Sequence, residues 1–195
     1  MGITVYTKSF DTPPVDKREI LRYAGAREGA DDIESLMEGC LAEASEVFTF
    51  KVCYSVVNVT RDGDRVDLEF ASVTSQGLSK VLDGCERAVV FAATVGLGVD
   101  RLIARYQTYA PSKALMLQAI GAERIEALCD AFCREIAREY KAVRPRFSAG
   151  YGDLPLELQR DIFRVLDCQR RIGLTLNESL LMSPSKSVTA IIGVR

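Results

Sequence analysis

The longest regular pattern in the sequence is helical and runs from residue 112 to residue 140. Apolar side chains recur there every three or four residues, a spacing that places them on one face of an α-helix. Ser112 is a residue type that commonly caps a helix N-terminus. So long an amphipathic helix needs a large apolar surface to cover, and this strongly limits the possible folds. Its apolar face consists of Leu115, Ala119, Ala122, Ile125, Leu128, Cys129 and Phe132.

Three other segments predict the β-strands that such a helix could cover. Residues 87–94 (RAVVFAAT) form a continuous apolar run suited to a buried central strand. Residues 48–59 are rich in β-branched and aromatic side chains and are followed by an alternating pattern in residues 66–70, which predicts a β-hairpin turning at Asp62-Gly63. Residues 187–194 (SVTAIIGV) predict a final strand.

Shorter helical patterns surround these strands. Helices are predicted over residues 15–24, ending at Gly25, and over residues 75–82. Two more are predicted to begin at Asp31 and at about Val99, and Pro155 is expected in the first turn of another. The sequence therefore predicts an α+β fold with helices clustered around a mainly antiparallel sheet. Because 48% of the 195 residues are hydrophobic and no linker is visible, residues 1–195 are expected to form a single domain.

Composition excludes several classes of function. The 25 basic and 27 acidic residues give a net charge of -2 without long runs of one sign, so neither a nucleic-acid nor a membrane partner is expected. The start MGITVYTKSF does not resemble a signal peptide and no apolar stretch could span a bilayer, which predicts a cytoplasmic protein. The chain has no histidine, so His-based catalytic triads and His metal sites are excluded.

Two motifs have both a structural and a functional interpretation. Cys129 and Cys133 lie four residues apart on the long helix and could form a thiolate or redox pair, but core packing is favoured because no further ligands are near. The six cysteines in general are expected to be small buried side chains. Gly96-x-Gly98 lacks the third glycine of a dinucleotide loop and is followed by Asp100, which disfavours phosphate binding.

The most informative stretch is residues 144–153 (RPRFSAGYGD). An arginine next to a loop of small residues can hold a carboxylate bidentately, although a solvated surface loop is the simpler interpretation. Glu123 and Glu126 lie near the edge of the long helix's apolar face, where spacing alone favours solvent over a cleft. Glu178 is interpreted from its neighbours as a surface-turn residue.

Arg146-Phe-Ser-Ala-Gly150-Tyr151 resembles the Arg-x-x-x-Gly-Tyr signature of the activation domain of cobalamin-dependent methionine synthase. Residues 172–179 (IGLTLNES) and 182–188 (MSPSKSV) are similar to the Gly-x-x-Leu-Thr-Glu-Ser, Met-x-Pro and Ser-Val segments that follow in the family. The resemblance covers about residues 112–194. Asn177 departs from the family pattern, which often has threonine there.

The resemblance implies binding of S-adenosylmethionine (AdoMet). Arg146 would bind the carboxylate of AdoMet, the backbone of the following loop its amino and adenosine ends, and Tyr151 its methyl-donor side. Glu123 or Glu126 would compensate the ammonium or sulfonium charge, and Asp11 or Asp16 would be the acidic contact near the N-terminus. The AdoMet-binding candidates are Arg146, Phe147, Ser148, Ala149, Gly150, Tyr151, Glu123, Glu126 and Glu178.

In the resembling family, the domain presents AdoMet to cobalamin that has been oxidised to inactive cob(II)alamin, while a flavodoxin-type protein supplies an electron. The resemblance therefore implies an accessory module, with cobalamin carried by a separate methionine synthase or related corrinoid protein. Two alternatives stay open. One is a non-catalytic scaffold or regulatory domain that has lost AdoMet binding; the other is an independent small-molecule methyltransferase, which would usually need a parallel sheet with a glycine-rich loop.

Overall fold

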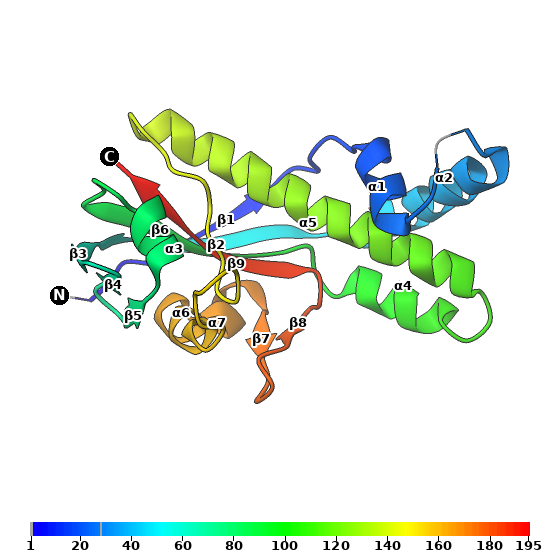
Figure 1. Ribbon diagram of the computed structural model, residues 1–195. Helices are drawn as coiled ribbons and strands as arrows, with labels where there is room; N and C mark the ends of the chain where they lie inside the picture. Colours follow the sequence, from blue (N-terminus) through cyan, green and yellow to red (C-terminus); the bar gives the residue numbers. More distant parts are fainter. Residues whose placement is uncertain (1, 28) are drawn as a thin grey trace.

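The computed structural model describes residues 2–27 and 29–195, and it is built around a four-stranded sheet (Figure 1). All neighbouring strands of this sheet are antiparallel. The predicted α+β class with a mainly antiparallel sheet is thus confirmed. In spatial order the strands are β1 (Tyr6–Phe10), β2 (Phe50–Asn58), β6 (Arg87–Thr94) and β9 (Ser187–Val194).

The long helix α5 (Pro111–Glu139) crosses one face of the sheet (Figure 1). Alternate residues of β6 on this face, including Phe91, join the apolar face of α5 in one buried cluster. The rings of Phe91 and Phe132 lie 4.8 Å apart between centroids, which is within the range of favourable aromatic contacts. Three more helices pack on α5 or its neighbours: α1 (Lys17–Ala24), α2 (Asp31–Ser45) and α4 (Gly98–Tyr106).

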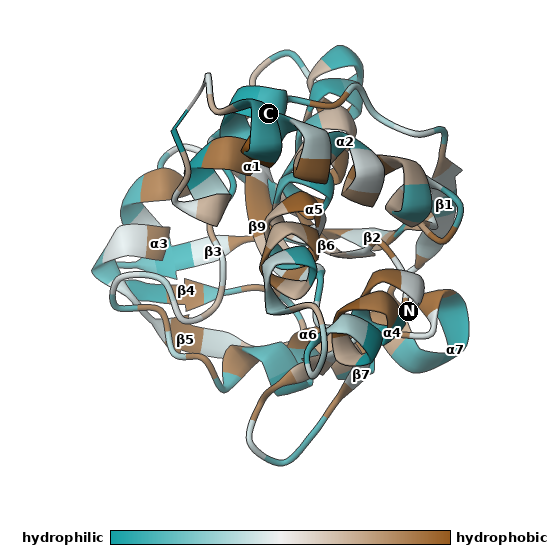
Figure 2. Cartoon of the chain, turned by 90° about the vertical axis from the view of Figure 1, so that its right-hand side faces the viewer, coloured by the Kyte–Doolittle hydropathy of each residue, from teal (hydrophilic) through white to brown (hydrophobic). Residues whose placement is uncertain are grey.

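A second buried cluster covers the opposite face of the sheet. There the intervening residues of β6, such as Val90, meet α6 (Leu158–Leu166), α7 (Cys168–Ile172) and α3 (Gln76–Val81). Strand β6 is therefore buried on both faces, as its continuous apolar run predicted. Figure 2 shows the hydrophobic residues gathered on the strands and inner helix faces, with hydrophilic residues on the outer surfaces of the helices.

The predicted hairpin exists, with its turn at Gly63-Asp64, but its first strand is wrong: residues 60–62, rather than residues 48–59, pair with residues 65–67. Strand β2 pairs with β1 on one side and β6 on the other, so both of its edges are occupied. The turn at Gly63-Asp64 instead closes a smaller three-stranded sheet outside the main one. That smaller sheet consists of β3 (Thr60–Asp62), β4 (Arg65–Asp67) and β5 (Ser72–Thr74). A separate two-stranded sheet near the C-terminus consists of β7 (Thr175–Leu176) and β8 (Met182–Ser183).

Two helix starts also differ from their predictions. Helix α5 begins at Pro111, so Ser112 lies inside the helix, and its N-cap Ala110 makes no side-chain capping bond. Proline suits this first position because the N–H that it lacks would have no partner inside the helix. Helix α6 begins at Leu158, whose N–H bonds to the carbonyl of Pro155, so Pro155 precedes the helix in a turn.

Arg124 joins α5 to the segment that leads into α1. This residue is 1% exposed, and its guanidinium donates to the carbonyl oxygens of Pro13 at 2.6 Å and Pro14 at 2.7 Å. It also donates two 2.5 Å bonds to the carboxylate of Glu123, which accepts the N–H of Asp16 at 3.0 Å. Glu123 is 4% exposed, so the expectation that it faces solvent is wrong: its partners compensate the cost of burying its charge.

Among the described residues, no helix is long and apolar enough to cross a membrane.

We expect Arg124→Ala to lower the free energy of unfolding by about 3–5 kcal/mol, because it leaves the Glu123 carboxylate buried without its cationic partner. Chemical denaturation measures this change. Arg138→Ala on the same helix is the control, since Arg138 is exposed and its replacement should change stability by less than about 0.5 kcal/mol. Equal effects of the two substitutions would contradict the buried-pair interpretation.

Candidate functional site

A pocket of about 750 Å³ lies between α5 and the segment formed by α1 and the residues just before it. Helix α5 supplies one wall, with side chains from four successive turns. The other wall is the segment that Arg124 fixes to α5 through the carbonyl groups of Pro13 and Pro14. The lining residues are Pro13, Pro14, Asp16, Glu19, Arg22, Tyr23, Glu123, Glu126, Ala127, Asp130 and Arg134.

Carboxylates outnumber guanidinium groups in the lining, and most of them have partners within their own element. Asp16 caps α1 by accepting the N–H groups of Arg18 and Glu19, and Glu19 pairs with Arg22 at 2.6 Å. Glu123 is bound to Arg124, so its charge is compensated inside the protein. Glu126 and Asp130 of the α5 wall form ion pairs with an arginine that does not line the pocket.

That partner is Arg146, which lies in the segment after α5. The backbone of this segment runs along the edge strand β9: the N–H of Arg144 bonds to the carbonyl of Gly193, and Phe147 and Ile191 exchange two bonds, all at 2.9 Å. Between these anchors the Arg146 guanidinium reaches α5. It donates to Asp130 at 2.5 Å and to Glu126, so this contact joins one guanidinium to two carboxylates.

The surroundings of Arg146 stabilise its positive charge. Burial acts to lower the pKa of the guanidinium, but the hydrogen bond to Asp130 and the charge of Glu126 outweigh it and raise the pKa. The Cys133 thiol lies 3.9 Å from a guanidinium nitrogen; burial raises its pKa, and the contact with Arg146 opposes that rise only in part. Arg146 is therefore a fixed cation, and Cys133 is a thiol that resists deprotonation.

The loop of residues 147–153 turns away from this pocket toward the other face of the sheet. Asp153 fixes it to the start of α3 by accepting bonds from Ser75 Oγ at 2.6 Å and from the N–H groups of Gln76 and Gly77. Gly150 has a φ of +84°, a conformation that residues with a side chain rarely adopt. Tyr151 is 68% exposed and packs its ring edge on Phe147.

The structure brings together only part of the predicted site. Arg146 and Glu126 are in contact, and Glu123 lines the same pocket although it is paired with Arg124. The residues that follow Arg146 (Phe147, Ser148, Ala149, Gly150 and Tyr151) do not line this pocket, and the N–H groups of Phe147, Gly150 and Tyr151 are bonded inside the protein.

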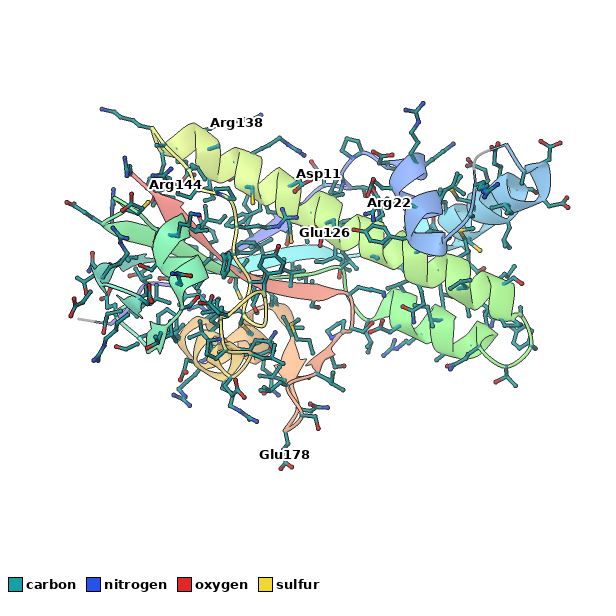
Figure 3. The ribbon with its side chains drawn as sticks, in the orientation of Figure 1. Asp11, Arg22, Glu126, Arg138, Arg144 and Glu178 are labelled. Carbon is teal, nitrogen blue, oxygen red and sulfur yellow. The ribbon has the colours of Figure 1, made fainter. Side chains whose placement is uncertain are left out.

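Glu178 lies away from Glu126 (Figure 3) and does not line the pocket. It is exposed between β7 and β8, at the opposite side of the molecule from Glu126 (Figure 3). Its backbone carbonyl accepts a bond from Arg160 of α6. A ligand-binding role for Glu178 stays a prediction, and the position of this residue gives it no support.

Sequence reasoning missed Asp130 and the α1 wall of the pocket. Asp130 lies one helical turn beyond Glu126, so the i,i+4 spacing of the two carboxylates was a usable signal. For Glu19, Arg22 and Tyr23 the sequence offered no signal, because only the fold places α1 against α5.

The Cys129 and Cys133 pair and the Gly96-x-Gly98 segment both have structural roles. Cys129 is fully buried and Cys133 partly buried against the α5 core cluster, so the packing interpretation is confirmed. All six cysteines are free. A Cβ on Gly98 would lie 2.4 Å from the carbonyl oxygen of Val47, so this glycine permits a close approach of α4 to that segment. The Asp100 carboxylate, next to it, accepts bonds from Ser185.

Comparison with known structures identifies the fold. A similar fold is found in a crystal structure of the MetH reactivation domain bound to AdoHcy (S-adenosylhomocysteine). The alignment covers 99% of the present chain and 79% of the MetH chain, with a TM-score of 0.71 and 15% sequence identity. The chain therefore has the fold of a methionine synthase reactivation domain. No match was found among curated proteins.

The family model of the vitamin B12 dependent methionine synthase activation domain matches residues 79–194, which is more than half of the chain. The chain belongs to this family, as the Arg146 to Tyr151 motif and the segments after it suggested.

We expect Gly150→Ala to lower the free energy of unfolding by about 1–2 kcal/mol, because alanine is strained at this positive φ. The new Cβ would also lie 2.8 Å from Leu156 Cδ1. Gly39→Ala, at an exposed position in α2 with no atom within 4 Å of the added Cβ, should instead stabilise by about 0.5–1 kcal/mol. Thermal or urea unfolding of both variants checks the opposite signs, and destabilisation by both would refute the conformational argument.

Proposed function

We propose that this chain is an AdoMet-binding reactivation module that acts in the cytoplasm as one domain. It would support the reductive remethylation of cob(II)alamin on a separate methionine synthase or related corrinoid protein. Its membership of the activation-domain family supports this function. The observation that carries the proposal to particular residues is the contact of Arg146, in the family-like motif, with Glu126 and Asp130 on the wall of an acidic pocket.

The charges of the site suit an amino-acid end that is attached to a sulfonium. Arg146 offers a planar fork of donors for the carboxylate of AdoMet. Glu126 and Asp130 offer negative charge for its ammonium and sulfonium groups. Glu123 is less suited than Glu126 to bind the positive groups of AdoMet, because Arg124 already neutralises the charge of Glu123.

The loop after Arg146 would complete the site from the other side of the sheet edge. Tyr151, with most of its side chain in solvent, can cover the methyl-donor side of a bound AdoMet without losing core contacts. The anchor of Asp153 on α3 holds the loop in place while Arg146 contacts Glu126 and Asp130 on the pocket wall. We assign the backbone carbonyl groups of Ala149 and Gly150 to the adenosine end of the ligand, because those of Phe147 and Ser148 already accept bonds from the N–H groups of Ile191 and Tyr151.

Cobalamin, on its carrier protein, would supply the cobalt centre that accepts an electron and the methyl group. This chain's share would be to bind AdoMet, to orient its methyl group and to keep water from the reacting atoms. The proposed partners are therefore a corrinoid protein and a flavodoxin-type electron donor. Neither requires a nucleophile or metal site on this chain.

A scaffold that has lost AdoMet binding is the second candidate, because the guanidinium of Arg146 already has two carboxylate partners. These carboxylates are 42% and 56% exposed, and ion pairs with such exposure contribute little, about 0–1 kcal/mol, so a ligand can replace them. An independent methyltransferase with a doubly wound parallel sheet does not agree with the antiparallel main sheet.

We expect AdoMet to bind saturably, and Arg146→Ala to weaken binding by about 2 kcal/mol, roughly thirtyfold, through loss of charge-assisted hydrogen bonds. Isothermal titration calorimetry measures both affinities. Arg144→Ala is the matched control, since Arg144 lies two residues away and donates to the carbonyl of Asp83 outside the pocket. Absence of AdoMet binding to the unaltered protein would favour the scaffold, and full affinity of Arg146→Ala would remove this arginine from the site.

A further inference from the structure

Two cysteine side chains from distant parts of the chain meet inside the protein. Cys53 of β2 and Cys168 at the start of α7 are 115 positions apart in the sequence, yet their Sγ atoms lie 3.9 Å from each other. Both residues are fully buried in the cluster that covers the sheet face opposite α5. A disulfide needs the two sulfurs at about 2.05 Å, and small rotations of the two side chains can supply that approach.

The surroundings of the pair divide between its members the two roles that disulfide formation requires. The contact with the Cys168 thiol lowers the pKa of Cys53, burial opposes this effect, and the charge of Arg171 supports it. The same contact and burial raise the pKa of Cys168, and the charge of Asp167 adds to that rise. Because the thiolate is the nucleophile in thiol chemistry, Cys53 is the sulfur that reacts first and Cys168 the one that follows.

A pocket of about 490 Å³ lies next to the pair, between α6, α7 and β7, and Cys168 is one of its lining residues. Helix α7 has only five residues, and Asp167, which precedes it, has a φ of +49° that is strained for a residue with a side chain. So short a helix with a strained start can open locally. Opening of α7 at this pocket would expose both sulfurs to a molecule as small as hydrogen peroxide.

We propose that Cys53 and Cys168 form a reversible disulfide, which makes the pair an oxidation site for peroxides. The Cys53 thiolate attacks one peroxide oxygen, the O–O bond breaks, and the departing hydroxide takes a proton to become water. The Cys168 sulfur then attacks the sulfur of the resulting sulfenic acid, the S–O bond breaks, and a second water leaves with the Cys168 proton. Two thiols are oxidised to one disulfide while one peroxide molecule is reduced to two water molecules.

The disulfide would tie α7 to β2 on the sheet face away from α5. The pocket proposed for AdoMet lies on the other face, between α5 and the segment that contains α1. The oxidation site therefore stands or falls independently of AdoMet binding.

Cys129 and Cys133 provide an internal control within the same chain. They lie four residues apart on α5, and Cβ atoms at that spacing on a helix are about 5–6 Å apart. A disulfide requires Cβ atoms about 3.5–4.5 Å apart. The helix geometry therefore keeps these two sulfurs from joining, and we expect both to remain thiols.

The test is peptide mapping of the folded, reduced protein after treatment with hydrogen peroxide, with the remaining thiols alkylated before digestion. Trypsin releases Cys53 in residues 52–61 and Cys168 in residues 165–170. We expect mass spectrometry to find these two peptides joined in most molecules, with loss of two of the six free thiols, and dithiothreitol to restore all six. Residues 125–134 should carry Cys129 and Cys133 in alkylated form.

Two variants check that the loss of thiols belongs to this pair. Cys53→Ala should abolish both the joined peptide and the loss of two thiols. Cys85→Ala is the matched control, because Cys85 is also buried but contacts the carbonyl of Asp83. This variant should form the joined peptide to the same extent as the unaltered protein, whose own result decides the proposal without either variant.

Three results would overturn the proposal. The first is recovery of both peptides unjoined and alkylated from the peroxide-treated folded protein. The second is a joined peptide that forms only after unfolding in urea, since the fold would then not be what brings the sulfurs together. The third is oxidation of Cys53 or Cys168 to a sulfinic acid without joining, which would mean that the second sulfur does not react with the first.

Discussion

The structure depends on the burial of strand β6 on both of its faces. An antiparallel strand with a continuous apolar run has to be covered from two sides, and here one side meets α5 and the other meets α6, α7 and α3. This requirement places β6 in the middle of the sheet and leaves β9 as an edge strand. The edge of β9 is in turn what the segment after α5 uses to place Arg146.

The candidate site is a consequence of two anchors of different kinds. Backbone hydrogen bonds to β9 set the direction of Arg146, and the buried Arg124–Glu123 pair ties the α1 wall to α5. Helix α5 connects the two, because Arg124 points into the protein while Glu126 and Asp130, nearby on the same helix, line the pocket and face Arg146. A single helix thus carries both the structural pair and the carboxylates of the proposed site.

The regular elements with strong periodicity were predictable. The patterns of α5, β6 and β9 gave their type and nearly their bounds, because burial on one face or on two faces imposes a recognisable spacing. Strand β1 was not predicted, and the partner of β2 was predicted wrongly, because pairing joins segments that are distant in sequence. For Glu123, spacing gave its position on α5 but not the presence of Arg124 and the Asp16 N–H as partners.

The sequence by itself determined the fold class, the long helix and, through the motif at Arg146 to Tyr151, the family. It could do so because helix and strand periodicity and short motifs are local properties. Only the tertiary structure decided that Arg146 meets Asp130, that α1 closes a pocket and that Glu178 lies far from both. Those arrangements depend on how segments far apart in the chain pack, and packing is set by the burial of the whole core rather than by any one segment.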